Sequence, residues 1–130
     1  MFLYIVKIQT VNGSKEIKDP VIRAAIAHLY FESIHPFEDG NGRIGRAIAE
    51  KAISQTLGRP VMLSLSKTIE RDRTAYYQAL KLAQSANEIS EWLKYFVNIA
   101  LQAQLDAKQM IDFTLRKIKV FDLFKDELNE

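Results

Sequence analysis

The chain contains no cysteine, and this absence excludes two kinds of structure. A disulfide framework and a metal site built from thiolates both require cysteine side chains, so neither can stabilise this fold. A chain without cysteine is also compatible with a reducing compartment.

Long apolar runs are missing as well. No stretch of the sequence approaches the roughly 18 to 20 consecutive apolar residues that a membrane-spanning helix needs. The short apolar run from Phe2 to Val6 lacks the preceding basic region and the following small-residue cleavage site of a secretory signal. We therefore expect no signal peptide, no membrane partner and a cytoplasmic location.

Neither sign of charge dominates, since 18 Lys and Arg against 16 Asp and Glu leave a net charge of +2. This balance is too mild to predict nucleic-acid binding, and the sequence has no dense basic run with interleaved aromatic residues. Glycine and proline are scarce, at 5 and 3 of 130 residues, whereas 48% of the residues are hydrophobic. Such a composition is typical of one globular domain with an apolar core.

Helical periodicity begins at Asp19. Asp19 is a typical N-cap, Pro20 suits the first helical position, and apolar residues then recur at helical spacing. This helix is expected over residues 20–34, because Pro36 forces the preceding His35 out of the helical conformation.

Three further helices are expected after this one. Helical spacing returns over residues 41–57. Ser64 or Ser66 can cap a third helix that continues to about Gln84. The last helical pattern is the longest and covers residues 89–128. The predicted fold class is therefore all-α.

The start of the chain follows a different pattern. Its residues partly alternate between apolar and polar, and Asn12-Gly13 is a strong turn signal, so a short strand or β-hairpin is expected there. We accordingly divide the chain into an N-terminal arm (1–18), a central helical unit (19–110) and a C-terminal helical extension (111–130).

The residues that carry the most chemical information are contiguous, from His35 to Arg46. Gly40 and Gly42 flank a helix start, where unpaired N–H groups attract anions and the missing Cβ atoms let phosphate oxygens approach. Arg43 and Arg46 are three residues apart on one helix face, and each offers a fork of donors. This pattern predicts a phosphate site.

Two further side chains add a metal ligand and a base to that site. The carboxylate of Asp39 is a hard oxygen ligand, which suits Mg²⁺ shared with substrate phosphates. Histidine titrates near neutral pH, so His35 can accept the proton of an attacking hydroxyl group.

The segment resembles the motif of the Fic (Fido) family, HxFx[DE]GNGRxxR, and matches it at every specified position. Residues 19–34 look like the helix that precedes the motif, and residues 71–77 look like the RxxxxYY segment of a later family helix. The resemblance covers most of residues 19–105. It implies a Fic helical bundle in which the motif loop leads into a central helix, with residues 19–110 as the catalytic core. It also implies Mg²⁺-dependent transfer of AMP from ATP to a Ser, Thr or Tyr hydroxyl of a target protein.

The resemblance further implies a role for each motif residue. His35 would be the general base, and Asp39 would hold Mg²⁺. The phosphate contacts would come from the helix start: Gly40, Asn41 and Gly42 around the α- and β-phosphates, Arg43 on the inner phosphates and Arg46 on the γ-phosphate.

The resemblance also suggests aromatic contacts. Phe37 would be a buried anchor of the loop. Tyr77 would line the adenine pocket with Tyr76 beside it, and Gln84 could touch the adenine ring. Aromatic residues at helical spacing are more often core than site, so a packing role for both tyrosines stays open. The inward positions of successive helices predict one core that contains Ile26, Leu29, Phe37, Ile48, Leu80, Trp92 and Phe96.

The sequence departs from the family pattern in three places. An inhibitory helix of pattern [ST]xxxE[GN] is not recognisable, because its nearest match, from Ser66 to Arg71, ends in Arg; we therefore expect no such helix to hold Arg46. Only 18 residues precede Asp19, so an intact but idle site without a target-binding flap is an alternative. Residues 111–130 look like a connector to a winged-helix domain, so nucleic acid would need a domain absent from this chain.

Other interpretations remain open at this level. His28 suits a structural histidine, Glu38 a solvated neighbour of the site, and Arg46 could pair with Glu50 at i,i+4 spacing instead of binding phosphate. The chain could also be a nucleotide-binding or regulatory fragment without catalysis, or a relative that transfers another phosphate-containing group or removes AMP. An antitoxin or regulatory partner, and a homodimer through the apolar stripe of the last helix, are further candidates.

Overall fold

The computed structural model describes residues 17–125 and residue 127, and every regular element in that part of the chain is an α-helix. The helices are α2 (Pro20–Ile34), α3 (Asn41–Leu57), α4 (Leu65–Arg71), α5 (Arg73–Ser85) and α6 (Ser90–Phe124). The all-α prediction is therefore confirmed. The strand or hairpin expected in the N-terminal arm lies outside the described residues.

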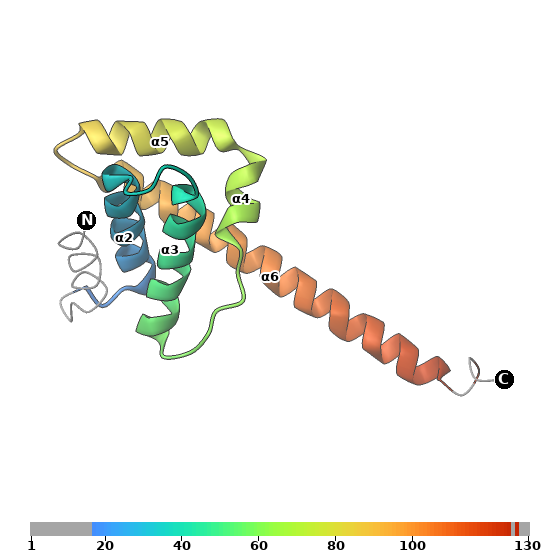
Figure 1. Ribbon diagram of the computed structural model, residues 1–130. Helices are drawn as coiled ribbons and strands as arrows, with labels where there is room; N and C mark the ends of the chain where they lie inside the picture. The colour runs from blue at the N-terminus through green and yellow to red at the C-terminus, as the bar shows by residue number, and fades with distance from the viewer. Residues whose placement is uncertain (1–16, 126, 128–130) are drawn as a thin grey trace.

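The helices form a small bundle from which one long helix projects (Figure 1). Helices α2 and α3 lie side by side, and α5 lies across one end of the pair. The first half of α6 packs against α2, α4 and α5, whereas its second half leaves the bundle as a single helix. In the part of the chain that the structure describes, no helix is both long and apolar enough to cross a membrane.

Helix α2 begins and ends as the sequence predicts. The Asp19 carboxylate accepts hydrogen bonds from the N–H groups of Val21 (2.9 Å) and Ile22 (2.8 Å). The helix ends at Ile34, and His35 follows as its C-cap in the left-handed conformation. The path of the chain into the motif loop is thus set by local capping.

Helices α2 and α3 approach closely at Gly45. A Cβ atom at this position would overlap Oε1 of Glu32 and would lie 3.2 Å from Cε1 of His28. The absence of a side chain at Gly45 therefore lets two buried polar residues of α2 reach the backbone of α3. This close contact fixes the motif helix against its neighbour.

The predicted core is confirmed in part. Leu29, Leu80, Trp92 and Phe96 lie in one cluster of buried residues, and the indole N–H of Trp92 donates to the Ala25 carbonyl oxygen at 2.9 Å. This bond ties α6 to α2 inside the core.

Three other predicted core positions differ. Ile26 and Ile48 are only half-buried. The prediction for Phe37 is wrong, because its side chain is 39% exposed and its ring lies 6.3 Å from that of Phe31, measured between centroids. The backbone of Phe37, not its ring, is fixed in the loop, because its N–H and carbonyl oxygen both form hydrogen bonds with the side chain of Asn41.

The third predicted helix is two helices. The chain breaks at Asp72, which has φ −145° and ψ 76° and accepts a hydrogen bond from the Ala75 N–H at 2.9 Å. Aspartate competes for backbone N–H groups in this way, so it favours a helix start over a helix interior. Of the two serines proposed as the earlier cap, Ser64 is the one used, with its Oγ 3.3 Å from the Lys67 nitrogen.

Candidate functional site

His35 stands where the chain leaves α2. Its φ of 48° and ψ of 59° make it the single non-glycine residue with a positive φ in the described part of the chain. Its N–H still donates to the Phe31 carbonyl oxygen at 3.0 Å, which closes the last turn of α2. The chain then turns away from the helix, and the side chain of His35 is exposed to solvent. An exposed imidazole can accept a proton from a large substrate such as a protein.

Asn41 holds the loop that follows. Its side-chain amide donates to the Phe37 carbonyl oxygen at 2.6 Å and accepts from the Phe37 N–H at 3.0 Å. The side chain is almost fully buried. Asn41 was expected to contact phosphate, but this amide is already engaged on both sides. What Asn41 can offer an anion is its backbone N–H, while its side chain shapes the loop.

Helix α3 begins with an N-cap that has no side chain. Gly40 occupies the N-cap with φ 81°, a conformation that other residues adopt at a cost. Because no side chain at this position accepts hydrogen bonds, the N–H groups of the first turn remain available to a ligand. Together with the helix dipole they favour an anion at this end of α3.

A cleft of about 240 Å³ opens beside this helix end. It lies between the start of α3, helix α4 and the start of α5, and its lining contains three arginines and two acidic residues. The lining residues are Asp39, Gly40, Gly42, Arg43, Arg46, Ser66, Ile69, Glu70, Arg73, Tyr76 and Tyr77. The structure thus brings together seven of the predicted site residues; His35 and Asn41 belong to the adjoining loop and helix start rather than to the lining.

Arg46 is oriented by helix α4. Its Nε donates to Oγ of Ser66 at 2.6 Å. The alternative pairing with Glu50 is not formed, because Oε1 of Glu50 instead accepts from the Leu65 N–H at 3.0 Å, at the start of α4. Among the described residues no carboxylate lies within ion-pair distance of Arg46. Its guanidinium therefore lines the cleft without an ion-pair partner in the described part of the chain.

Asp39 lines the same cleft and directly precedes the N-cap of α3. One carboxylate oxygen accepts from the Gly40 N–H at 2.7 Å, and the other lies 3.9 Å from an Nη atom of Arg43. The side chain is 96% exposed. Within the described residues no group of three His, Asp or Glu side chains could enclose a metal ion. A lone accessible carboxylate beside an anion site fits Mg²⁺, which commonly takes one or two carboxylates, substrate phosphate oxygens and water.

The two tyrosines have different environments. Tyr76 is buried, and its hydroxyl group lies 2.8 Å from Nε2 of His28. Tyr77 is 62% exposed, and its ring meets that of Tyr76 edge-on at 5.1 Å between centroids. Tyr77 therefore presents a free aromatic surface at the cleft, whereas Tyr76 forms part of its floor. Gln84, near the far end of α5, does not line the cleft.

Buried polar residues of α2 lie beneath the site. The pKa of His28 is lowered to about 4. Burial is the main cause and the nearby positive charge of Arg46 acts in the same direction, whereas a hydrogen bond to the backbone of Gly45 opposes both. His28 is thus neutral at pH 7 and structural, as expected. Burial also raises the pKa of Glu32, while the charges of His35 and Arg46 oppose that rise.

Several residues of the site were not predicted from the sequence. Ser66, Ile69, Glu70 and Arg73 line the cleft, and the last two form an ion pair at 3.4 Å. Ser66, Ile69 and Glu70 share one face of α4 at helical spacing, but Arg73 follows the break at Asp72, so this spacing alone does not identify the four residues. Glu32 was also missed, because an acidic residue inside a helix is usually exposed.

The comparisons with known proteins agree with this geometry. Residues 4–53 match the sequence profile of the Fic/DOC family. The match shows a likeness to that family over this segment, which is less than half of the chain. The matched range contains His35, the motif loop and the start of α3.

Individual relatives of the Fic/DOC segment carry informative names. The protein adenylyltransferase fic-1 of Caenorhabditis elegans is 34% identical over 77 residues, which are 59% of this chain and 14% of the relative. The protein adenylyltransferase Fic of Drosophila melanogaster is 37% identical over 68 residues, 52% of this chain and 13% of the relative. A probable protein adenylyltransferase of Aquifex aeolicus is 27% identical over 123 residues, 82% of this chain and 35% of the relative. The chain therefore spans only a minor part of the length of these relatives.

Proposed function

We propose that this chain is the catalytic segment of a protein adenylyltransferase, which transfers AMP from Mg²⁺-bound ATP to a hydroxyl group of a target protein. The observation that carries the proposal is the convergence at one cleft of an uncapped helix start, Arg43 and Arg46, with Asp39 and His35 beside it. The names of the Fic relatives support the same reaction. We place the reaction in the cytoplasm, with which a chain lacking cysteine is compatible.

The proposed binding mode follows from the shape and charge of the cleft. The first-turn N–H groups of α3 hold the inner phosphates, and Arg43 and Arg46 neutralise the remaining charge. Asp39 would hold Mg²⁺, which would supply positive charge to stabilise the leaving pyrophosphate. The exposed ring of Tyr77 offers a stacking surface for adenine.

The chemical step needs one proton transfer from the target. The target hydroxyl oxygen forms a bond to the α-phosphorus, and the bond between that phosphorus and the oxygen bridging to the β-phosphorus breaks. A ring nitrogen of His35 accepts the hydroxyl proton and later releases it to water. The products are the AMP ester of the target and pyrophosphate. The fixed backbone of the loop, which Asn41 clamps, holds the base in place for this transfer.

The position of a radioactive label tests the proposal. The purified chain is incubated with a cell lysate and Mg²⁺, with ATP labelled either at the α- or at the γ-phosphate, and labelled protein is counted. Adenylyl transfer predicts protein-bound label from α-labelled ATP alone.

Two other outcomes would replace the proposed function. Protein-bound label from γ-labelled ATP alone would indicate a phosphorylating relative. Binding of Mg·ATP in the cleft with no transfer from either label would indicate a nucleotide-binding segment that does not catalyse.

A further inference from the structure

The second half of α6 exposes an apolar stripe that continues the core. In the first half of the helix, Trp92, Phe96, Ala100 and Ala103 are buried against the bundle. The same helix face continues beyond the bundle with spacings of four and three residues, through Ala107, Ile111, Thr114, Ile118 and Phe121. The large side chains of this continuation are about half exposed, at 42% for Ile111, 50% for Ile118 and 54% for Phe121. Figure 1 shows this half of α6 projecting away from the other helices.

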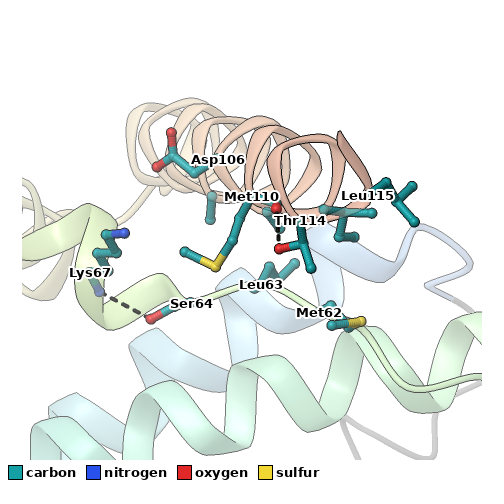
Figure 2. A pocket seen from close by; sticks show the side chains of 11 residues that line it. Met62, Leu63, Ser64, Lys67, Asp106, Met110, Thr114 and Leu115 are labelled. Carbon is teal, nitrogen blue, oxygen red and sulfur yellow. Dashed lines mark hydrogen bonds between the residues drawn. The ribbon is translucent and has the colours of Figure 1, made fainter. Parts of the chain in front are cut away.

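An apolar groove lies at the root of this stripe. It has a volume of about 500 Å³ and separates α6 from the segment that leads into α4. Figure 2 shows Met110 of α6 pointing toward that segment, which contributes Met62 and Leu63 to the lining. Ala107 and Ile111 of the stripe also line the groove, so stripe and groove form one continuous surface.

We propose that a second copy of this chain covers this surface, with the two α6 helices packed antiparallel about Leu115. Alternating spacings of four and three residues define a heptad seam, which is the pattern of paired helices. In the antiparallel register, Ile111 packs against the partner's Phe121, and Thr114 packs against the partner's Ile118. The hydroxyl group of Thr114 already donates to the Met110 carbonyl oxygen at 2.9 Å, so its methyl group is free to pack.

The residues beside the seam complement one another in the same register. Lys108 lies opposite the partner's Asp122, and two-fold symmetry repeats this pair. Leu115 meets its own counterpart on the two-fold axis, and Met110 meets the partner's Phe124 above the groove. The register places one pair of like charges opposite each other, namely Lys117 of the two copies. The Nζ atom of Lys117 lies over the ring of Phe121 in its own helix, 5.9 Å from the ring centroid.

The bundle excludes the parallel arrangement. In α6 the face that carries the stripe is also the face on which the bundle packs, from Trp92 to Ala103. Two parallel helices joined along this face would bring both bundles to the same end and into the same space. In the antiparallel pair, each bundle instead meets only the tip of the partner's α6.

The exposed area is sufficient for a dimer. Six large apolar side chains lie on or beside the seam: Met110, Ile111, Leu115, Ile118, Phe121 and Phe124. At roughly half exposure, they offer on the order of 100 Å² each, or about 600 Å² per copy before the groove walls are counted. Two copies would together bury about 1,200 Å², which is the lower end of the range for stable interfaces.

The molar mass in solution tests the proposal, with two changes of an exposed apolar residue of α6 to aspartate, one on the stripe and one on the opposite face. Sedimentation equilibrium of the full chain over a concentration series should give the mass of a dimer. Ile118→Asp, on the stripe, should give a monomer, whereas Leu123→Asp, which adds the same charge on the opposite face of α6, should leave the dimer intact. A monomeric parent chain, or equal effects of the two variants, would overturn the proposal.

A charge exchange tests the antiparallel register. Lys108→Asp and Asp122→Lys should each weaken dimerisation about tenfold, because each places like charges opposite one another at two symmetric positions. The double variant exchanges both charges and should restore the affinity of the parent chain. Additive losses in the double variant would show that these residues do not meet, and would contradict this register. All of these readouts are masses, so they are independent of whether AMP transfer occurs.

Discussion

At the residue scale, the site depends on side chains that do not themselves meet a ligand. The buried pair of His28 and Tyr76 joins α2 to α5, and Asn41 clamps the loop backbone at Phe37. These contacts leave Arg46 and His35 to face outward. The position of the motif residues therefore depends on buried polar side chains beneath them, and the protonation state of one of these, His28, affects the stability of the fold.

The depressed pKa of His28 predicts an acid-sensitive fold. A histidine with a pKa near 4 in the folded state and 6.5 in the unfolded state binds protons more readily when unfolded. Its contribution to stability is therefore complete above pH 6.5 and is lost as the pH falls toward 4. Between pH 7 and pH 5 the loss should be about 2 kcal/mol in the free energy of unfolding, measured by urea denaturation. The raised pKa of Glu32 acts in the opposite direction above pH 4.5, so the contribution of His28 is obtained by comparing variants that differ only in a histidine.

The two histidines of the chain provide the matched comparison. His28→Gln keeps a hydrogen-bonding group toward Tyr76 and should remove most of this pH dependence. His35→Gln removes the exposed histidine and should retain it. An unchanged pH dependence in His28→Gln would show that other groups control the acid sensitivity.

At the element scale, the sequence predicts helices α2 and α3 well because strong local signals bound them. Asp19 and Pro20 start α2, and glycines flank α3 at Gly40 and Gly58. The break at Asp72 was not predicted, since an apolar pattern at helical spacing runs through it and outweighs one capping residue. That break separates α4 from α5, and both helices line the cleft.

The predictions for Phe37 and Asn41 within the motif differ from the structure for a related reason. The pattern identifies Asn41 and Phe37 as important but does not distinguish a side chain that binds a ligand from one that shapes the loop. That distinction depends on the path of the backbone between His35 and Gly40, which is set by a positive φ at each end. The residues contributed by α4 were missed because their role arises only when α4 packs beside α3.

Helix α4 provides a test of this packing. Ser66→Ala removes the hydrogen bond to Nε of Arg46 and should weaken Mg·ATP binding roughly tenfold, because the guanidinium loses its fixed orientation. Calorimetric titration gives the dissociation constant. The control is Ser85→Ala at the end of α5, whose hydroxyl group bonds only to carbonyl oxygens of its own helix and which should bind as tightly as the parent chain. Equal affinities for all three proteins would show that α4 does not orient Arg46 for the nucleotide.

At the scale of the whole molecule, the bundle and the projecting helix have separate tasks. The bundle carries the cleft between α3, α4 and α5, and the distal half of α6 carries the surface proposed to bind a second copy. The groove below that surface is bounded by the segment that leads into α4, and Arg71 of α4 is paired with Asp106 of α6 at 2.7 Å. A partner seated in the groove would therefore lie against the elements that support Ser66 and, through it, Arg46.

The central claim is that nucleotide binding and proton transfer belong to different residues of one motif. The most direct measurement compares the parent chain with His35→Ala in two assays: calorimetric titration with Mg·ATP, and transfer of α-labelled AMP to protein. In the proposed mechanism His35 accepts a proton only during the reaction, and it does not line the cleft, so the variant should bind Mg·ATP with unchanged affinity. Transfer should fall by about 10²- to 10⁴-fold, the usual effect of losing a general base. Transfer by His35→Ala at the rate of the parent chain would contradict the account.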